Sequence, residues 1–513
     1  MRANDANRQI LGDGETAFLD LREAGPFSEG HPLFAVPVPY SSLETHIGVF
    51  VPRLSTSLIL IDDGDGVAEA GAETLASMGY RDIAIVEGGA PAWADAGLTL
   101  FKGVNVPSKT LGELAEARFH PKTIQPETLA RWQRENRKIS FFDCRPPVEF
   151  QKMTVPGAAC LPNGEIAHRL PALRPEEPIV ITCAGRTRGI IGALSLAQIA
   201  PSREIYALEN GTQGWALAGL DLKRGAAPGA LPELDGDNAG KTRTRAEALI
   251  DAESLSLIGS SDVATFLEDE TRTTYLFDVR SSDEANDDPL AAFTHVWSGQ
   301  LVQATDRWVG VRHARVVLAD DLGLRAALAA FWLRALGLDV HITRIDDRLR
   351  AIPVPDYPVA PSLSFDEIDA ADALTEMVRD AACLLDLRRS WRYASGHVAG
   401  SFWTIRPNLS AFANWDRLLL IGDEEHEVNI GARELLHLGH KNFALVKGGF
   451  QALSDSGASI ETSNPLPLST AIDVTSFAHG RHDGDLDASR QYLDWEQGLL
   501  QALSKEERAA FDL

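Results

Sequence analysis

Four short apolar runs along the chain end in the same way, with an aspartate and, two positions later, an arginine. They are FLDLR (18–22), FFDCR (141–145), LFDVR (276–280) and LLDLR (384–388). Each is followed by a second apolar run that leads into a loop: LILI from Leu58, IVIT from Ile179, VVLA from Val316 and LLLI from Leu418. Repetition of one pattern along a chain indicates repeated structural units. The sequence therefore predicts four copies of one unit.

Within each copy, short apolar runs typical of buried strands alternate with segments that have helical apolar spacing. Alternation of this kind predicts an α/β fold, with a mainly parallel sheet covered by helices on both faces. In such sheets, ligands bind where the carboxyl ends of the strands lead into helices. The loop after the second apolar run is therefore the place to look for a functional site.

Turn-rich segments divide the chain. A stretch rich in Pro, Gly and Asp (224–241) separates the first two copies from the last two, and another lies near 353–362. The tail carries an apolar stripe at Tyr492, Trp495 and Leu499, continued by Leu503, which indicates a helix that packs on a domain. The expected parts are domain 1 (1–107), domain 2 (108–228), a linker (229–245), domain 3 (246–352), domain 4 (353–465) and a partly helical tail (466–513).

The composition is that of an ordinary globular protein, 44% hydrophobic and 24% charged, with a net charge of −25. A broad anionic surface repels nucleic acid and anionic lipid, so neither is an expected partner, and any site for an anion must be locally basic. The N-terminal segment lacks an apolar signal core, and no apolar run is long enough to span a membrane. We therefore expect a cytoplasmic protein.

The four cysteines show no metal-ligand spacing, which argues against a zinc site and a disulfide framework. Cys144 and Cys383 lie inside apolar strands and are interpreted as packed residues. Cys160 follows a Pro-Gly-Ala turn; packing is the simpler interpretation there, and a resolving thiol is the alternative. Cys183 differs, because it ends a strand and begins a loop that contains two arginines.

The loop CAGRTRG (183–189) has the features that activate a thiol. A free cysteine has a pKa of about 8.5, and positive charge or a helix N-terminus lowers it. Arg186 and Arg188 supply charge that does not titrate, and the following helix presents its positive end. Gly185 and Gly189 permit a tight backbone path. At the position of Cys183 the other three copies carry Asp62, Asp320 and Gly422.

Further residues of the second copy complete a recognisable set. They are Asp143, Arg145, Glu149, the turn Val-Pro-Gly-Ala at 155–158, Pro162 and Glu-Asn-Gly-x-x-x-Trp at 209–215. This set resembles the rhodanese sulfurtransferase family. The resemblance extends in degenerate form over the whole chain and implies four tandem rhodanese-like domains, of which only the second keeps a nucleophile. Asp143 and Arg145 recur in every copy, so we interpret them as a structural ion pair.

The resemblance implies a sulfurtransferase that moves sulfane sulfur from a small anionic donor such as thiosulfate to a thiol or cyanide. Cys183 would carry the sulfur as a persulfide, and no metal or other cofactor is expected. Arg186 and Arg188 would bind the donor, together with the backbone of the other loop residues: Ala184, Gly185, Thr187 and Gly189. Many family loops place the glycine one position later than Gly185, which leaves the preferred donor open.

Two other functions remain open at this stage. A cysteine phosphatase or arsenate reductase has five residues between the cysteine and the arginine, whereas four separate Cys183 from Arg188. A sulfur-sensing or scaffold protein without turnover is the second alternative, motivated by the three loops that lack cysteine. Alternatively, the copies without cysteine shape the entrance to Cys183 or hold a homodimer together.

Overall fold

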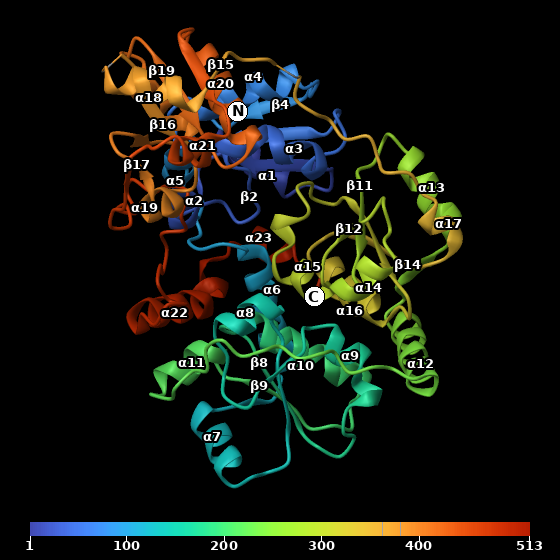
Figure 1. Ribbon diagram of the computed structural model, residues 1–513. Helices are drawn as coiled ribbons and strands as arrows, with labels where there is room; N and C mark the ends of the chain where they lie inside the picture. Colours follow the sequence, from blue (N-terminus) through green and yellow to red (C-terminus); the bar gives the residue numbers. More distant parts are fainter. Residues whose placement is uncertain (362, 380) are drawn as a thin grey trace. The chain divides into compact units, whose positions relative to one another are not determined.

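The computed structural model of the protein describes residues 1–361, 363–379 and 381–513 (Figure 1). Ser362 and Asp380, which fall in the expected fourth domain, lie outside the described residues. The described part contains four larger sheets, in which every strand pair is parallel, with helices packed against them. The predicted α/β fold class is confirmed.

Three of these sheets have five strands in the same spatial order. The first is β5-β9-β8-β6-β7, from β5 (Thr123–Ile124), β6 (Ser140–Asp143), β7 (Ala159–Cys160), β8 (Ile179–Thr182) and β9 (Ile205–Leu208). The second is β10-β14-β13-β11-β12, from β10 (Ser256–Ile258), β11 (Thr274–Asp278), β12 (Thr294–His295), β13 (Arg315–Asp320) and β14 (Asp339–Arg344). The third is β15-β20-β19-β16-β18, from β15 (Glu367–Ile368), β16 (Cys383–Asp386), β18 (Phe402–Trp403), β19 (Leu418–Ile421) and β20 (Phe443–Val446).

The fourth sheet is β2-β1-β3-β4, from β1 (Thr16–Asp20), β2 (Val36–Pro37), β3 (Ser57–Ile61) and β4 (Ile83–Ile85). Read in the opposite direction, this order corresponds to that of the other three sheets. The strand equivalent to β5, β10 or β15 is absent from this sheet in the described part of the chain. A small antiparallel pair joins β17 (His397–Val398) to β21 (Ile460–Glu461). The same succession of strands is therefore folded four times along the chain.

The chain divides into two compact units, which we describe separately. The first unit comprises 1–7, 17–104 and 357–477, and the second comprises 8–16, 105–356 and 478–513. Helix α1 (Ala3–Ile10) begins in the first. Its other helices are α2 (Ala24–Glu29), α3 (Leu43–Phe50), α4 (Val67–Ser77), α5 (Gly89–Asp95), α18 (Ala370–Val378), α19 (Ser390–Ser395), α20 (Glu425–His437) and α21 (Gly449–Asp455).

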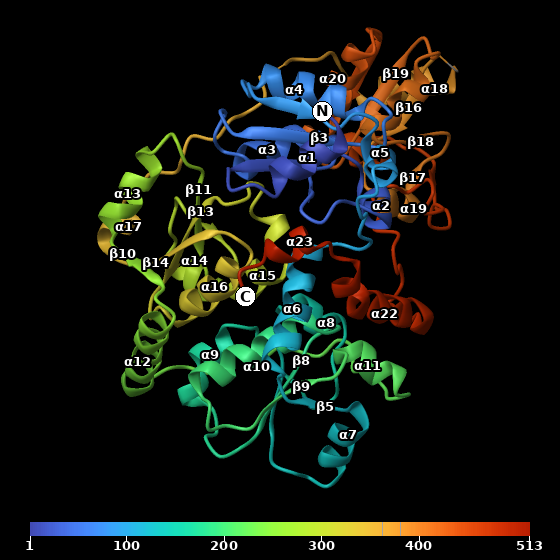
Figure 2. The same ribbon diagram turned by 180° about the vertical axis from the view of Figure 1, so that it is seen from behind.

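The second unit is the one that carries Cys183, and its helices are labelled in Figure 1 and, from behind, in Figure 2. They are α6 (Val106–Phe119), α7 (Pro126–Arg134), α8 (Pro147–Lys152), α9 (Glu165–His168), α10 (Thr187–Ile199), α11 (Gly211–Leu217), α12 (Gly236–Ala252), α13 (Ser260–Glu268), α14 (Ser282–Asp287), α15 (Ser298–Gln303), α16 (Leu324–Ala335), α17 (Asp347–Arg350), α22 (Leu486–Ala502) and α23 (Lys505–Ala509).

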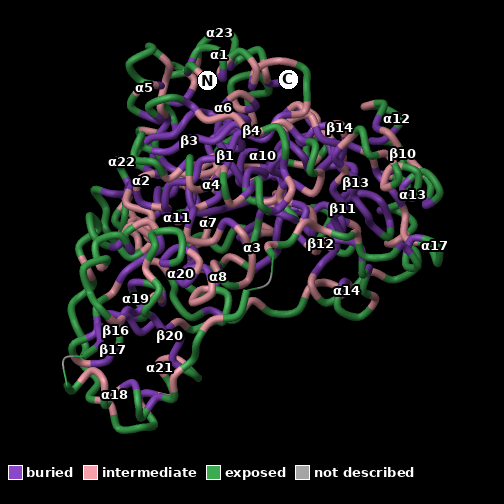
Figure 3. Tube along the Cα trace, turned by 90° about the horizontal axis from the view of Figure 1, so that it is seen from above, coloured by how far each residue is buried: buried purple, intermediate pink, exposed green. Residues whose placement is uncertain are grey.

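The strands form the core of each sheet because their side chains are apolar on both faces. Ile179, Val180 and Ile181 of β8 have no exposed surface, and the central strands are drawn as buried in Figure 3.

An Asp-x-Arg sequence lies at the end of the first apolar run of each copy. In every copy the arginine binds the aspartate and a carbonyl eight residues further along the chain: Arg22 with Gly30, Arg145 with Met153, Arg280 with Asp288 and Arg388 with Gly396. The predicted structural ion pair is confirmed.

The segment expected as a linker, 229–245, is helical over much of its length. Helix α12 begins at Gly236, where the Asp235 side chain accepts a hydrogen bond from the Asn238 amide at 2.8 Å. Thr242, Ala246 and Leu249 form its buried face. Both prolines of the 224–241 stretch precede this cap, and Gly236 and Gly240 are accommodated within the helix.

The C-terminal tail ends in helices, as predicted. Helix α22 packs against α6 and α11 in the same unit. Tyr492 and Leu499 of the apolar stripe are buried, and Trp495 and Leu503 are half-buried. Among the described residues, no helix combines the length and the hydropathy needed to cross a membrane.

Candidate active site

Cys183 lies where strand β8 ends and the loop into α10 begins. Strand β8 is the central strand of its sheet, between β6 and β9. Helix α10 starts at Thr187, so its positive N-terminal end faces the loop. This is the carboxyl edge of a parallel sheet, where the fold class predicts a site.

The first turn of α11 holds the loop in place. The Thr212 amide donates to the Cys183 carbonyl at 2.8 Å, and the Gln213 amide donates to the Ala184 carbonyl at 3.1 Å. Gly211 makes this contact possible. Its φ is +55°, and a Cβ there would lie 2.3 Å from the Cys183 carbonyl oxygen. A larger residue would therefore push the cysteine out of position.

The Cys183 side chain is buried, with 2% of its surface exposed. A hydrogen bond from the Cys144 thiol lowers the pKa of Cys183; burial opposes this, and the Arg188 charge and the Gly189 amide lower the pKa further. A Cβ on Gly189 would lie 3.7 Å from the sulfur, so α10 approaches the thiol closely. The environment therefore favours the thiolate, the nucleophilic form of cysteine.

Arg188 is fixed beside the thiol by a bidentate ion pair. Its Nη1 and Nη2 donate to the two carboxylate oxygens of Glu149 at 2.7 and 2.8 Å, and Nη1 also donates to Gln300 Oε1 at 3.1 Å. Burial opposes ionisation of Glu149, but the Arg188 charge and hydrogen bonds hold the pKa of Glu149 at about 2. The pair stays charged over the physiological pH range.

Arg186, expected from the sequence to bind the donor, is paired with carboxylates of α6. Its Nε donates to Glu113 Oε1 at 2.8 Å, and its Nη2 binds both Glu113 and Glu116 on α6. Burial raises the pKa of Glu113 to about 7, although Arg186 pairs with it. Arg186 therefore anchors the loop to α6, and Arg188 is the arginine whose charge acts on Cys183.

Helix α22 lies on the loop, a contact that the sequence did not reveal. Thr187 Oγ1 donates to Glu496 Oε1 at 2.7 Å. A Cβ on Gly185 would lie 3.1 Å from Glu496 Oε2 and 3.3 Å from Tyr492 Cε1. The glycine at this position thus gives α22 the space to pack. No signal within the loop itself points to this contact, since 309 residues separate Thr187 from Glu496.

Two further cations gather beside this part of α22. Lys109 Nζ lies 5.7 Å from the centre of the Tyr492 ring, and the Arg481 guanidinium carbon lies 4.6 Å from it. Burial lowers the pKa of Lys109 to about 8; the charges of Glu496 and Asp306 oppose this, and those of Arg481 and Arg188 add to it. Lys109 therefore lies within electrostatic reach of Arg481, Arg188 and the Glu496 carboxylate, and of these Arg188 lowers the pKa of Cys183 whereas Glu496 raises it.

Cys144 also belongs to this site, although its strand pattern suggested a purely packed residue. It is buried as expected, with 2% of its surface exposed, but its backbone pairs with the end of β8 next to Cys183, and the two thiols shift each other's pKa. Cys160 faces elsewhere and donates to the Arg145 carbonyl at 3.8 Å. Cys383 is part of an apolar core in the other unit. The parallel pairing of β6 with β8 brings Cys144 to the site, and no local sequence signal reveals that pairing.

In the other three loops, a carboxylate of the chain accepts the backbone amides. The contacts are Gly64 and Ala68 to Asp62 (2.8 and 3.0 Å), Arg325 and Ala326 to Asp320 (2.9 and 3.3 Å), and Asp423 and Glu424 to Glu427 (2.9 and 3.3 Å). Amides directed at one point form an anion-binding site. These three loops thus already bind an anion that is part of the chain.

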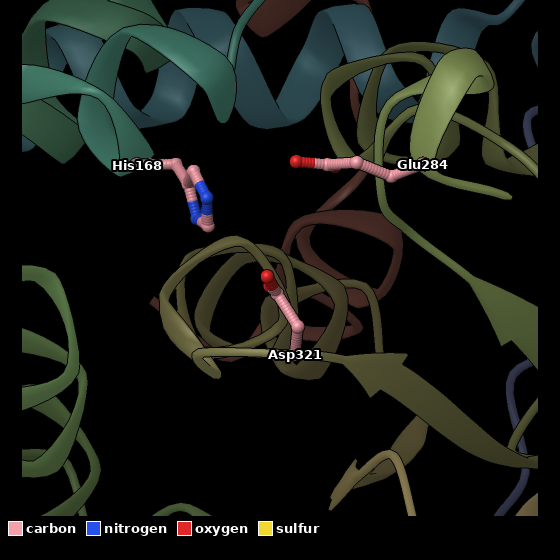
Figure 4. Close-up of side chains that lie close together, drawn as sticks. All are labelled: His168, Glu284 and Asp321. Carbon is pink, nitrogen blue, oxygen red and sulfur yellow. The ribbon is translucent and has the colours of Figure 1, made fainter. Parts of the chain in front are cut away.

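One cluster has the composition of a metal site. Single ligand atoms of His168, Glu284 and Asp321 lie within 4.8 Å of one another, and their side chains converge from α9, α14 and the loop after β13 (Figure 4). Glu284, however, pairs with Arg169 and Arg325 at 2.9 and 2.5 Å, and Asp321 pairs with Arg325 at 2.7 Å. Two guanidinium groups already neutralise these carboxylates, so we assign the cluster a structural role.

Comparisons with known proteins agree with these features. A family model described as "Rhodanese-like domain" matches residues 3–96 and 125–218. A solved structure of a thiosulfate sulfurtransferase from Pseudomonas aeruginosa is 33% identical, with a TM-score of 0.91, and the match covers 100% of this chain and 99% of that one.

A shorter match involves an HTH-type transcriptional regulator of Mycobacterium tuberculosis, 36% identical over 98 residues. This match takes in 19% of the present chain. The chain spans only 43% of that regulator's length.

Proposed function

The chain belongs to the family of rhodanese-like proteins, and from this premise we propose that it transfers sulfane sulfur through Cys183. A rhodanese-type sulfurtransferase is the class that the full-length match supports. We further propose the identity of the sulfur donor, of the sulfur carrier and of the acceptor. The donor is thiosulfate or a similar anion, the carrier is a Cys183 persulfide, and the acceptor is a thiol or cyanide.

The observation that carries the proposal is the environment of Cys183. Cys183 is a buried thiol at a helix N-terminus. The Cys144 hydrogen bond and the Arg188 charge lower its pKa, and burial opposes this shift. In the other copies a carboxylate accepts the amides of the loop. We therefore propose four rhodanese-like domains with one competent site, in the second.

In the first half-reaction, the Cys183 thiolate attacks the sulfane sulfur of the donor. The sulfur–sulfur bond of thiosulfate breaks, sulfite leaves with the electron pair, and Cys183 becomes a persulfide. Arg188 and Lys109 attract the donor and offset the charge on sulfite. The Gly189 amide and the N-terminus of α10 stabilise the negative charge on the sulfur.

In the second half-reaction, the acceptor attacks the outer sulfur of the persulfide. The Cys183 thiolate leaves with the electron pair and is ready for another cycle, so the kinetics are ping-pong. Ala184 and Gly185 contribute backbone to the loop, Thr187 ties it to α22, and Arg186 ties it to α6.

The test is steady-state formation of thiocyanate from thiosulfate and cyanide, with sulfite as the second product. Cys183→Ser is expected to lose both products. Cys160→Ser and Cys383→Ser are matched controls that remove a buried thiol elsewhere, and they are expected to keep the activity. Turnover by the Cys183 variant would overturn the proposal, and turnover of an aryl phosphate by the unaltered protein would favour a phosphatase instead.

A further inference from the structure

Cys144 and Cys183 occupy equivalent positions at the ends of adjacent strands. Strands β6 and β8 are parallel neighbours, with Asp143 opposite Thr182, and each cysteine follows the last paired residue. The Cys144 amide donates to the Thr182 carbonyl at 2.9 Å, which extends the pairing to the cysteine. The two thiols therefore start from neighbouring backbones and project from the same face of the sheet.

This placement suits a disulfide. Neighbouring strands lie about 4.8 Å apart, and disulfides join Cα atoms that are about 4.4–6.8 Å apart. Cys160 does not share this geometry, since it lies opposite Asp143 in the pairing of β6 with β7. Successive residues of a strand point to opposite faces, so Cys160 projects away from the face that carries Cys144.

The pair occurs in one copy. At the position of Cys144 the other three copies carry Leu21, Val279 and Leu387, and at the position of Cys183 they carry Asp62, Asp320 and Gly422. The fold therefore needs only a packed apolar residue at the position of Cys144. The second copy replaces it with a thiol where the neighbouring strand end also carries one.

We propose that Cys144 resolves the Cys183 persulfide, forming a Cys144–Cys183 disulfide and releasing the transferred sulfur as hydrosulfide. The step rests on the proposed sulfur transfer. The Cys144 sulfur attacks the inner sulfur of the persulfide and gives its proton to the outer sulfur. The new sulfur–sulfur bond replaces the one that breaks, and the outer sulfur leaves as HS⁻ with the electron pair.

The step needs no outside oxidant, because the sulfane sulfur is itself reduced to sulfide while the two thiols are oxidised to the disulfide. Over one turnover the protein converts thiosulfate into sulfite and sulfide. A small dithiol or a dithiol protein must then reduce the disulfide before the next donor binds. The second copy would therefore catalyse reduction of thiosulfate by a dithiol, in addition to transfer to an outside acceptor.

Both cysteines are 2% exposed, and α22 packs on the loop. An internal thiol reaches the persulfide without opening this cover, whereas an external thiol has to enter. Internal resolution is thus the favoured course when no small acceptor such as cyanide is present. With cyanide in excess, direct transfer competes.

The experiment is a single turnover of the full chain, reduced, desalted and kept free of oxygen, with thiosulfate and without cyanide or added thiol. Sulfite and sulfide are quantified, and the protein is alkylated and mapped. The unaltered protein is expected to release one equivalent of each product and to yield a linked Cys144–Cys183 peptide pair. Cys160→Ser is the matched control and is expected to behave in the same way.

Cys144→Ser is expected to release sulfite more slowly than the unaltered protein, because the thiol that lowers the pKa of Cys183 is replaced, so its single turnover is followed to completion. It should release no sulfide and should retain one extra sulfur on the peptide that contains Cys183. Cys144→Leu, the residue of two sibling copies, is a second variant in case serine disturbs folding, and it should also retain the sulfur.

The outcomes separate the two proposals. A persistent persulfide without sulfide in the unaltered protein would overturn resolution by Cys144 and leave sulfur transfer intact. Sulfide release by both Cys144 variants would overturn it as well. If none of the proteins releases sulfite, it is the proposed function that fails.

Discussion

The loop after Cys183 and the loop after Asp320 are built on the same plan. Both follow the central strand of a five-stranded sheet with one strand order, and both carry an arginine five positions on, Arg188 and Arg325. They differ in what the amides at the start of the helix bind. In one loop that group is the Asp320 carboxylate, which accepts the amides of Arg325 and Ala326. In the other, the Gly189 amide serves a reactive sulfur.

The two arginines have different surroundings. Arg325 is fully buried and binds four carboxylates, those of Asp320, Asp321, Glu165 and Glu284. Arg188 binds one carboxylate, Glu149, and the neutral amide of Gln300. The positive charge is therefore cancelled within the chain in the third copy, whereas in the second it still acts on the thiol. The loop that lacks the nucleophile is thus also the loop whose amides already bind a carboxylate of the chain.

The largest expected effect comes from making the second loop resemble the third. Cys183→Asp places a carboxylate where Asp320 stands, so the amides of the loop gain an internal anion and the nucleophile is lost. Thiocyanate formation should fall by about 10⁴-fold or more, the scale seen when a catalytic nucleophile is removed. The midpoint of thermal unfolding should change little, and a large loss of stability would show that the two loops are not equivalent.

Substitution of Arg188 should affect mainly activity, and substitution of Arg325 should affect mainly stability. Arg188→Gln should lower kcat/KM for thiosulfate by about 100-fold, on the scale of losing one charged group that stabilises a transition state. Arg325→Gln should instead lower the free energy of unfolding by about 3–5 kcal/mol, because it leaves buried carboxylates without a partner. Denaturant unfolding and steady-state kinetics on both variants check this. A loss of activity in the Arg325 variant without loss of stability would contradict it.

Lys109 gives the second copy a pH-dependent charge. Because its pKa is lowered to about 8 by burial, it is protonated below that pH and loses its charge above it. For an anionic donor, KM should therefore rise above pH 8 by up to about tenfold, the factor that corresponds to about 1.4 kcal/mol, while kcat changes less. Lys109→Arg should move this rise to higher pH. A rise at the same pH in that variant would assign it to another group.

The smallest expected effect comes from testing whether a thiol alone is enough to make the third loop active. Asp320→Cys in the Cys183→Ser background puts a thiol into the third loop. Asp321, Glu165 and Glu284 surround Arg325 there, so their charges oppose formation of a thiolate. We expect no thiocyanate above the background of Cys183→Ser alone. Restored turnover would mean that the third copy lacks nothing except its nucleophile.

Much of the fold could be predicted from the sequence because its signals are local. The apolar runs predict the strands, and the Asp-x-Arg ending predicts an ion pair that closes each of them. The start of helix α10 after the cysteine loop follows from the same pattern. The position of Cys183 at the carboxyl end of a central strand needs no more than this.

The rest of the site depends on long-range packing. Arg186 is paired with Glu113, on a helix 73 residues earlier in the chain. The contact of Cys144 with Cys183 depends on which strands are neighbours, and the run of apolar residues in β6 does not reveal that. The cations near Tyr492 come from segments that only tertiary structure brings together. Sequence patterns identify the nucleophile, and packing decides which groups surround it.

Helix α22 also has a consequence for the synthesis of the protein. Thr187 and Glu496, whose side chains join the cysteine loop to this helix, are 309 residues apart in the chain. A ribosome adds about 5–20 residues per second, so the Cys183 loop is synthesised many seconds before its cover exists. During that interval the Cys183 loop lies open to the thiols and oxidants of its surroundings. The finished site is assembled last, and a nascent chain depends on its surroundings to keep this cysteine reduced.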